Sequence, residues 1–164
     1  PGIDGFEILK KLRADETYSD LPVVVNTAKK LSATEKEFLN QWWGPAPWKA
    51  ETKSMDFREG GFWLYAMAGP ENQKHWARMN YLKINKHKNF EVEDFFCDET
   101  GNVDSILPAS KGEFIFTKTL TGINVDFKLK FADEAALKQT IEMGFEQGIS
   151  QCVDQLEVLL SKLK

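Results

Sequence analysis

The segment "GINVDFKLKFADEAALKQTIEMGFEQGISQCVDQLEVLLSKLK" (residues 122–164) contains the two patterns that decide the fold. Every second residue from 123 to 131 is apolar, which predicts a strand with one buried and one solvated face. From 133 to 163 the apolar residues recur at mostly fourfold spacing, which predicts one amphipathic helix about 45 Å long. This stripe comprises Leu137, Ile141, Phe145, Ile149, Leu156, Leu160 and Leu163. The long helix is therefore expected to cover one face of a sheet.

Five more strands are expected before this one, because the residues from Glu51 onward alternate with period two between turn signals. The turns contain Gly60-Gly61, Gly69-Pro70, Gly101-Asn102 and Thr121-Gly122. The six expected strands are 52–57, 62–69, 75–85, 88–97, 112–120 and 122–131. The simplest topology for them is an antiparallel meander. The fold class is therefore α+β, a curved antiparallel sheet wrapped round a long C-terminal helix.

The first forty residues have a different plan, which is helix, strand, helix. Residues 4–14 form an amphipathic pattern after a Pro-Gly and Asp-Gly turn signal. The β-branched run "LPVVVNTA" (21–28) is typical of a buried strand. "SATE" (32–35) is a capping box, which predicts a helix from there to about Asn40.

The composition narrows the function classes. The chain has 164 residues with 21 basic and 25 acidic side chains, a net charge of −4, so a nucleic-acid or anionic-membrane partner is not expected. No apolar run reaches the roughly 20 residues of a membrane span and no signal-peptide plan is present, so we expect a cytoplasmic protein. Cys97 and Cys152 are expected to be reduced thiols.

Catalytic signals are sparse. The two histidines, His75 and His87, have no partners at metal-ligand spacing, so neither a metal nor a cofactor is expected. There is no nucleophile elbow and no phosphate-binding loop. The acidic residues Glu91, Glu93, Asp94, Asp98 and Glu99 are interpreted as solvated charge at a strand end and loop. The sequence therefore favours a protein that is not an enzyme.

Three of the five tryptophans lie in "NQWWGPAPW" (residues 40–48). Their simplest role is a plug that closes one end of the space between sheet and helix, with about 1.5–3 kcal/mol from each buried ring. The alternative is that they line a cavity for an apolar ligand. The neighbouring strands raise the same question, because Leu64 and Ala66 are as apolar as Trp63 and Tyr65, and the inner face of strands 62–69 and 75–85 is left open.

Two polar residues and one glycine complete the candidate site. Arg78 and Asn80 have the same parity as Trp76, so they either hydrogen-bond a ligand or face solvent. Gly144 and Gly148 form a small-residue ridge on the long helix, which suggests a close approach to the sheet or a cavity. The candidate ligand-binding residues are Trp42, Trp43, Trp48, Trp63, Tyr65, Met67, Trp76, Arg78, Asn80 and Gly148.

Five ordered motifs resemble those of the bacterial homologues of the heat shock protein 90 ATPase activator, within the START and polyketide-cyclase superfamily. They are "QWWGP" (41–45), "DFREGGFWLYAMAGPE" (56–71), "HWARMNYLKI" (75–84), "FCDETGNV" (96–103) and "IEMGFEQGISQCVDQLEVLL" (141–160). The resemblance covers about residues 40–164 and implies a helix-grip, START-like fold. It also implies a chaperone-like protein partner as an alternative to a small apolar ligand.

Residues 1–40 are instead similar to the second half of a response-regulator receiver domain. Pro1 to Phe6 resemble the turn after the phosphoacceptor strand, and Thr27 resembles the switch threonine. The phosphoacceptor strand has no counterpart in the sequence, so no phospho-switch is expected. The interpretation is a chain of two parts: a receiver-like fragment (1–40), which supplies an extra helix plus the first strand and helix of the grip, and a helix-grip domain (41–164).

Three function classes follow. The first is a non-enzymatic helix-grip module that binds a small apolar ligand or a chaperone-like protein. The second is a recombinant or designed chimera without retained activity. The third, a cyclase or hydratase of the superfamily, is disfavoured because no acid-base pair can be placed in the cavity from the sequence.

Overall fold

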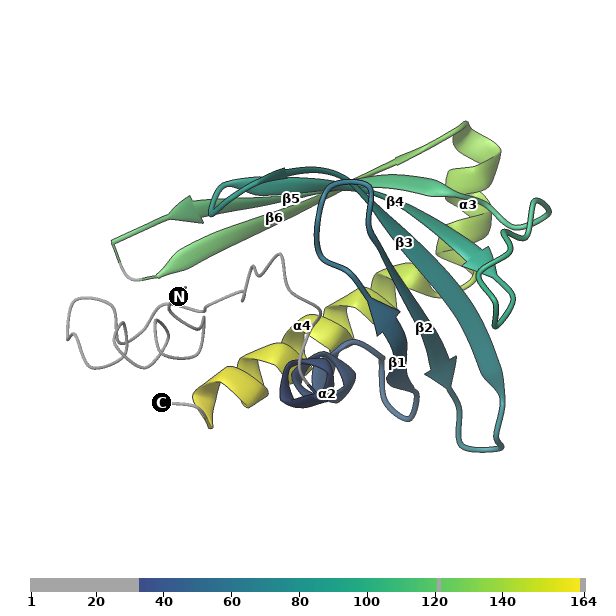
Figure 1. Cartoon of the computed structure of the whole chain (residues 1–164), viewed down its shortest axis with the longest axis horizontal. Coiled ribbons are helices and arrows are strands. Elements are labelled where there is room, and N and C mark those ends of the chain that lie inside the picture. The colour runs from purple at the N-terminus through teal and green to yellow at the C-terminus, as the bar shows by residue number, and fades with distance from the viewer. Residues whose placement is uncertain (1–32, 121, 163–164) are drawn as a thin grey trace.

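The computed structural model describes residues 33–120 and 122–162, with the side chains of 36–120 and 122–162 (Figure 1). The described elements are α2 (Ala33–Trp42), β1 (Lys49–Met55), β2 (Phe62–Ala68), β3 (Lys74–Asn85), β4 (Asn89–Cys97), β5 (Ser110–Lys118), β6 (Ile123–Phe131), α3 (Glu134–Glu142) and α4 (Phe145–Ser161). All six expected strands and the helix after the capping box are confirmed. The helix expected at 4–14 and the strand expected at 21–28 lie outside the described residues.

The strands form one antiparallel sheet in the order β1-β2-β3-β4-β5-β6, which confirms the meander. The register shifts between Thr52 and Ser54 in β1, and again between Tyr81 and Lys83 in β3. Such irregularities increase the local twist and help a sheet to curve. Figure 1 shows the sheet curving over α4, with α2 beside that helix.

Register settles which face of the sheet is the inner one. Trp63, Met79 and Asp94 lie opposite one another on β2, β3 and β4, so their side chains share a face. Tyr81 and Val92 are paired on the same face and are each at most 2% exposed. Trp63, Met79, Tyr81 and Val92 belong to the core, together with Ala50, Phe57, Tyr65 and Ala77. The inner face therefore comprises the odd-numbered residues of β2 and the even-numbered residues of β4.

The prediction of one long C-terminal helix is wrong. The helix is broken into α3 and α4 at Gly144, which has a φ of 84° in the left-handed region. Glycine adopts this conformation without the steric penalty of other residues, so Gly144 ends one helix rather than forming a ridge within it. The expected buried stripe is correspondingly incomplete, since Leu137 and Ile141 on α3 are 41% and 47% exposed.

The second glycine of the expected ridge faces the tryptophan segment rather than the sheet. A Cβ built on Gly148 would lie 3.5 Å from Cγ of Pro45, an ordinary van der Waals contact. Nearby, Nε2 of Gln155 donates to the carbonyl oxygens of Trp42 and Gly44 at 3.0 and 2.7 Å. Helix α4 is thereby fixed against the end of α2.

Two substitutions of Gly148 are expected to act in opposite directions. Gly148→Ala should stabilise the protein by up to about 1 kcal/mol, because alanine is the better helix former and its methyl group meets Pro45 without a clash. Gly148→Leu should destabilise it by about 1–3 kcal/mol through overpacking against the same loop. Urea unfolding of both variants measures these changes. Equal stability of all three proteins would show that α4 does not pack on Pro45.

Candidate functional site

Three aromatic rings meet on the inner face beneath α4. The centroids of Trp63 and Tyr65 are 4.2 Å apart in a stacked arrangement, and Trp43 lies 5.6 Å from Trp63 and 6.5 Å from Tyr65. Trp63 and Tyr65 are each 3% exposed. The first part of the expected site, the cluster of Trp43, Trp63 and Tyr65, is thus brought together by the fold.

A short hydrogen-bond network fixes this cluster. Nε1 of Trp63 donates to Oγ1 of Thr52 at 3.0 Å, and that hydroxyl donates to Oδ1 of Asn40 at 2.9 Å. The amide N–H of Thr52 donates to the same oxygen at 3.1 Å. The network ties α2, β1 and β2 together, so Trp63 has little freedom to change its orientation.

The apolar inner surface continues from the tryptophans across β4, β5 and β6 as a row of phenylalanines. Phe90 stacks on Phe114 at 4.5 Å between centroids, and Phe114 stacks on Phe127 at 4.2 Å. These three rings are only half-buried by the described residues, and Val125 on the same face of β6 is 50% exposed. The inner face therefore passes from a closed aromatic core to a surface that is incompletely covered within the described part of the chain.

Asp94 is the functional candidate that sequence reasoning missed. It was interpreted as solvated charge, but β4 lies in the middle of the sheet and the carboxyl group points to the inner face opposite Met79. Its Oδ1 is buried and has no hydrogen-bond partner among the described residues. Burial raises the pKa of Asp94 to about 7, against a smaller lowering by the backbone N–H of Phe95. No pattern of spacing in the sequence signals this position.

Two tyrosines form the surroundings of that carboxyl group. Burial and the neighbouring charge of Asp94 both raise the pKa of Tyr65 and of Tyr81, so the two phenols stay protonated. Nε1 of Trp43 is also buried, and it makes no hydrogen bond of ordinary length and angle in the described structure. Its N–H still lies close enough to the phenol of Tyr65 to act as a weak donor, which lowers the pKa of Tyr65 by less than burial and Asp94 raise it.

Three of the expected ligand-binding residues lie on the opposite, outer face of the sheet. Trp76, Arg78 and Asn80 alternate with the buried Ala77 and Met79 on β3. They therefore do not share a site with Trp63 and Tyr65. The hypothesis that Arg78 and Asn80 point into the cavity is wrong. The guanidinium of Arg78 lies 4.5 Å from the ring of Phe62 and donates to Oδ1 of Asn80 at 2.8 Å.

The loop after β4 covers part of the outer face of the sheet, so apolar side chains on that face are shielded from solvent. Gly101 lies over Leu64, and its carbonyl oxygen accepts a hydrogen bond of 3.3 Å from Arg78. Asp98 organises this loop by accepting hydrogen bonds from Thr100 and Asn102, which hold the pKa of its carboxyl group well below the usual range. Asp98 thus has a structural role in the loop.

The remaining expected residues lie at the rim of the inner face. Trp42 contacts Trp43 edge to face at 5.2 Å, and Met67 packs against the core. Trp48 lies away from this cluster, at the end of the sheet, with its ring 5.2 Å from the imidazole of His75. Gly148 contacts Pro45, as described above.

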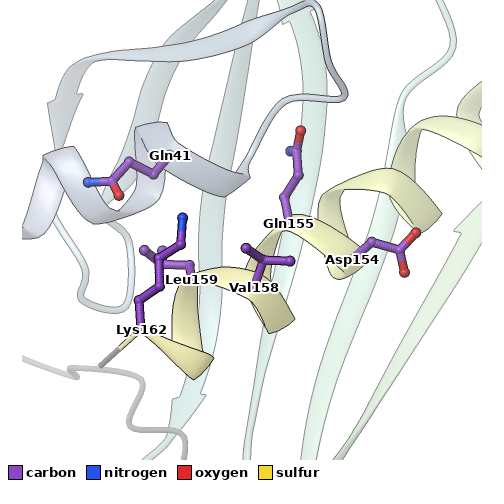
Figure 2. Close-up of a pocket in the computed structure, with 6 residues that line it drawn as sticks. All are labelled: Gln41, Asp154, Gln155, Val158, Leu159 and Lys162. Atoms are coloured by element: carbon purple, nitrogen blue, oxygen red, sulfur yellow. The ribbon is translucent and has the colours of Figure 1, made fainter. Parts of the chain in front are cut away.

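A hollow of about 350 Å³ lies between α2 and α4 (Figure 2). It contains none of the expected ligand-binding residues. Its lining residues are Gln41, Asp154, Gln155, Val158, Leu159 and Lys162, and most of the surface that they present to the hollow is apolar.

Residues 33–120 and 122–162 contain no group of three or more side chains arranged to hold a metal ion. Within the same residues, none of the helices has the length and apolar character needed to cross a membrane. Burial raises the pKa of the Cys152 thiol on α4, so this group stays protonated.

The combination of an antiparallel meander, a C-terminal helix beneath it and an aromatic inner face agrees with the sequence comparison. Residues 32–161 match the family described as "Activator of Hsp90 ATPase homolog 1-like protein". The chain belongs to this family. As a member of the Activator of Hsp90 ATPase homolog 1-like family, it has the START-type helix-grip fold that the sequence motifs implied. No curated protein matches the chain.

Solved structures of this fold are similar over most of their length. A protein from Mycobacterium smegmatis is 29% identical with a TM-score of 0.70, over 77% of this chain and 77% of that one. A protein from Arthrobacter aurescens is 26% identical with a TM-score of 0.72, over 79% and 75%. A protein from Staphylococcus epidermidis is 25% identical with a TM-score of 0.69, over 79% of each chain. Residues 1–31 lie outside the family match, and their resemblance to a receiver fragment stays a prediction.

Proposed function

We propose that this chain is a non-enzymatic helix-grip module that binds a small apolar ligand on the inner face of its sheet. The observation that carries the proposal is one apolar inner surface, which joins the buried Trp63 and Tyr65 and the partly buried Trp43 to the half-buried row of Phe90, Phe114 and Phe127. Concave sites with apolar, aromatic linings and few polar groups are typical of small-molecule binding.

A binding role fits this site better than catalysis. Asp94 has the raised pKa that a general acid or base requires. The two tyrosines whose pKa values Asp94 raises, Tyr65 and Tyr81, are held in their protonated forms. We therefore assign Asp94 to recognition rather than to turnover.

Binding of the neutral apolar dye Nile red tests the proposal. The dye should bind saturably to the full chain with increased fluorescence. Phe127→Asn should weaken binding about fivefold or more, because it removes a half-buried ring that stacks on Phe114. Trp76→Asn is the matched control on the outer face and should leave the affinity unchanged. If no dye binds, a chimera without retained activity is the better account, and if Trp76→Asn alone weakens binding, the inner face is the wrong surface.

A protein partner is a second candidate function, favoured by exposed apolar side chains where α3 meets α4. Leu137, Ile141 and Met143 are 41%, 47% and 52% exposed, and Phe145 is 38% exposed. Apolar side chains that gather at a surface are typical of interaction sites. The family description names a chaperone ATPase, so the test is whether the chain stimulates the ATPase of purified heat shock protein 90 and whether Ile141→Asp abolishes this effect. An unchanged ATPase rate would remove this candidate.

A further inference from the structure

The hollow between α2 and α4 shares no lining residue with the aromatic cluster of the inner face (Figure 2). Its volume of about 350 Å³ lies within the range of small-molecule sites. Gln41 on α2 forms one wall, and the other lining residues belong to α4 and its C-terminal cap. Asp154, Val158 and Lys162 follow one another at fourfold spacing, so they share one face of that helix. The hollow therefore extends along about two turns of α4.

The walls of the hollow are held together and are mostly apolar. Nε2 of Gln155 donates to the carbonyl oxygens of Trp42 and Gly44 at 3.0 and 2.7 Å, which joins α4 to the end of α2 beside the hollow. Val158 is 53% exposed and Leu159 is half-buried, and both line the hollow. A ligand that covers such apolar surface removes it from water, which favours binding. The hollow thus fits the apolar part of a small molecule.

The two charged residues of the lining point in different directions. Figure 2 shows the ammonium group of Lys162 reaching from the end of α4 toward Gln41, whereas the carboxyl group of Asp154 points away from the other labelled side chains. Neither charged residue forms an ion pair with a side chain of residues 36–120 and 122–162. The C-terminus of a helix carries a partial negative charge, but it is only about half of the charge of a lysine. One end of the apolar hollow is therefore positive.

We infer that this hollow binds a small amphiphilic carboxylate, which is an apolar chain with one negatively charged end. The chain lies against Val158 and Leu159, and the carboxylate pairs with the ammonium group of Lys162. A neutral chain of the same length lacks this charge pair, and a chain that ends in an ammonium group meets a like charge. The hollow and the inner face of the sheet have separate linings, so this ligand is additional to the one proposed for the inner face.

Titrations of the full chain with octanoate, octanol and octylammonium, followed by NMR at pH 7, test this inference. The backbone amide shifts of Val158 and Leu159 report binding in the hollow. Octanoate should bind there about fivefold more tightly than octanol, and octylammonium should bind more weakly than octanol, because only the carboxylate pairs with Lys162. High salt should remove the preference, since it screens exposed charges. Equal affinities of the three probes, or tightest binding of octylammonium, would overturn the inference.

The indole N–H of Trp63 reports the inner face of the sheet in the same spectra. Shifts at Trp63 without shifts at Val158 and Leu159 would overturn the inference while the proposed function stands. Saturable shifts at Val158 and Leu159 alone would support the inference and count against the proposed function. Shifts at neither place would overturn both.

Two variants locate the site. Lys162→Met keeps an unbranched apolar chain without the charge, so it should bind octanol as before and lose the preference for octanoate. Val158→Asp places a negative charge in the hollow at a position that is 53% exposed, so it should weaken octanoate binding about fivefold or more without unfolding the chain. Lys128→Met on an exposed position of β6 is the matched control and should retain the preference. A preference for octanoate that persists in Lys162→Met would contradict the assignment.

Discussion

Asp94→Asn is expected to make the protein more stable at pH 8, by about 2–4 kcal/mol. The reason is that burial raises the pKa of Asp94 from 3.8 to about 7, so the folded state resists ionisation of this carboxyl group. In the unfolded chain the same group ionises near its ordinary value. Asparagine has a similar shape and no charge, so it removes the cost of a buried carboxylate.

The pH dependence of this effect has a definite sign. Between about pH 4 and pH 7 the folded state holds a proton on Asp94 that the unfolded state has released, so stability falls as the pH rises through this window. Above it the loss is complete and constant. Tyr65 and Tyr81 face the carboxyl group but stay protonated throughout, because burial raises both of their pKa values above the ordinary one.

Urea unfolding at pH 4 and pH 8 checks this prediction. The two proteins should differ little at pH 4, where Asp94 is protonated in the folded state and only roughly half ionised in the unfolded chain, and should differ much more at pH 8. Asp126→Asn on an exposed position of β6 is the matched control and should show no such difference. A loss of stability in Asp94→Asn at pH 8 would mean that the carboxylate is favourably paired. A stabilising change in a core is often found where function requires an unfavourable group.

Trp63→Ala is expected to destabilise the protein by about 3–5 kcal/mol. The ring is 3% exposed and lies between Trp43 and Tyr65, and its N–H donates to Thr52. Truncation creates a cavity in the core and removes the N–H group that donates to Thr52. Because the site is buried, water cannot replace either the lost packing or the lost hydrogen bond.

Trp48→Ala is the matched control for this truncation. Trp48 is half-buried at the end of the sheet, beside Gly69 and His75, so its removal should cost no more than about 1–2 kcal/mol. Urea unfolding of the two variants measures the difference. Equal losses would contradict the placement of Trp63 in the core and of Trp48 at the rim.

The strands could be predicted from the sequence because their signals are local. In β6, for example, Val125, Phe127 and Leu129 alternate with charged neighbours, and this alternation alone fixes both the strand and its inner face. In β2 the inner face could not be predicted, because Leu64 and Ala66 on the outer side are 5% and 0% exposed. They are buried by structure around β2, including the distant loop at Gly101, a tertiary contact that alternation does not encode.

The two errors in the helical part and in the site have related causes. The fourfold spacing of apolar residues continues through Gly144, so periodicity hid a break that depends on a left-handed backbone at one residue. Asp94 stands among other acidic residues, and it points inward because its register opposite Met79 puts it on the same face of β4 as Val92. The sequence alone predicted that several tryptophans lie close together. Only the register of the strands shows that Trp43 and Trp63 are on the inner side of the sheet, whereas Trp76 is on the outer face.

The indole N–H resonances of the five tryptophans give the most direct test of ligand binding on the inner face. Their chemical shifts in the full chain are followed by NMR as methylnaphthalene is added. The resonances of Trp43 and Trp63 should shift with a common saturable dependence on probe concentration, while that of Trp76 on the outer face should not move. Movement of Trp76 alone, or saturable binding with no change at Trp43 and Trp63, would contradict the assignment of the binding site to the inner face.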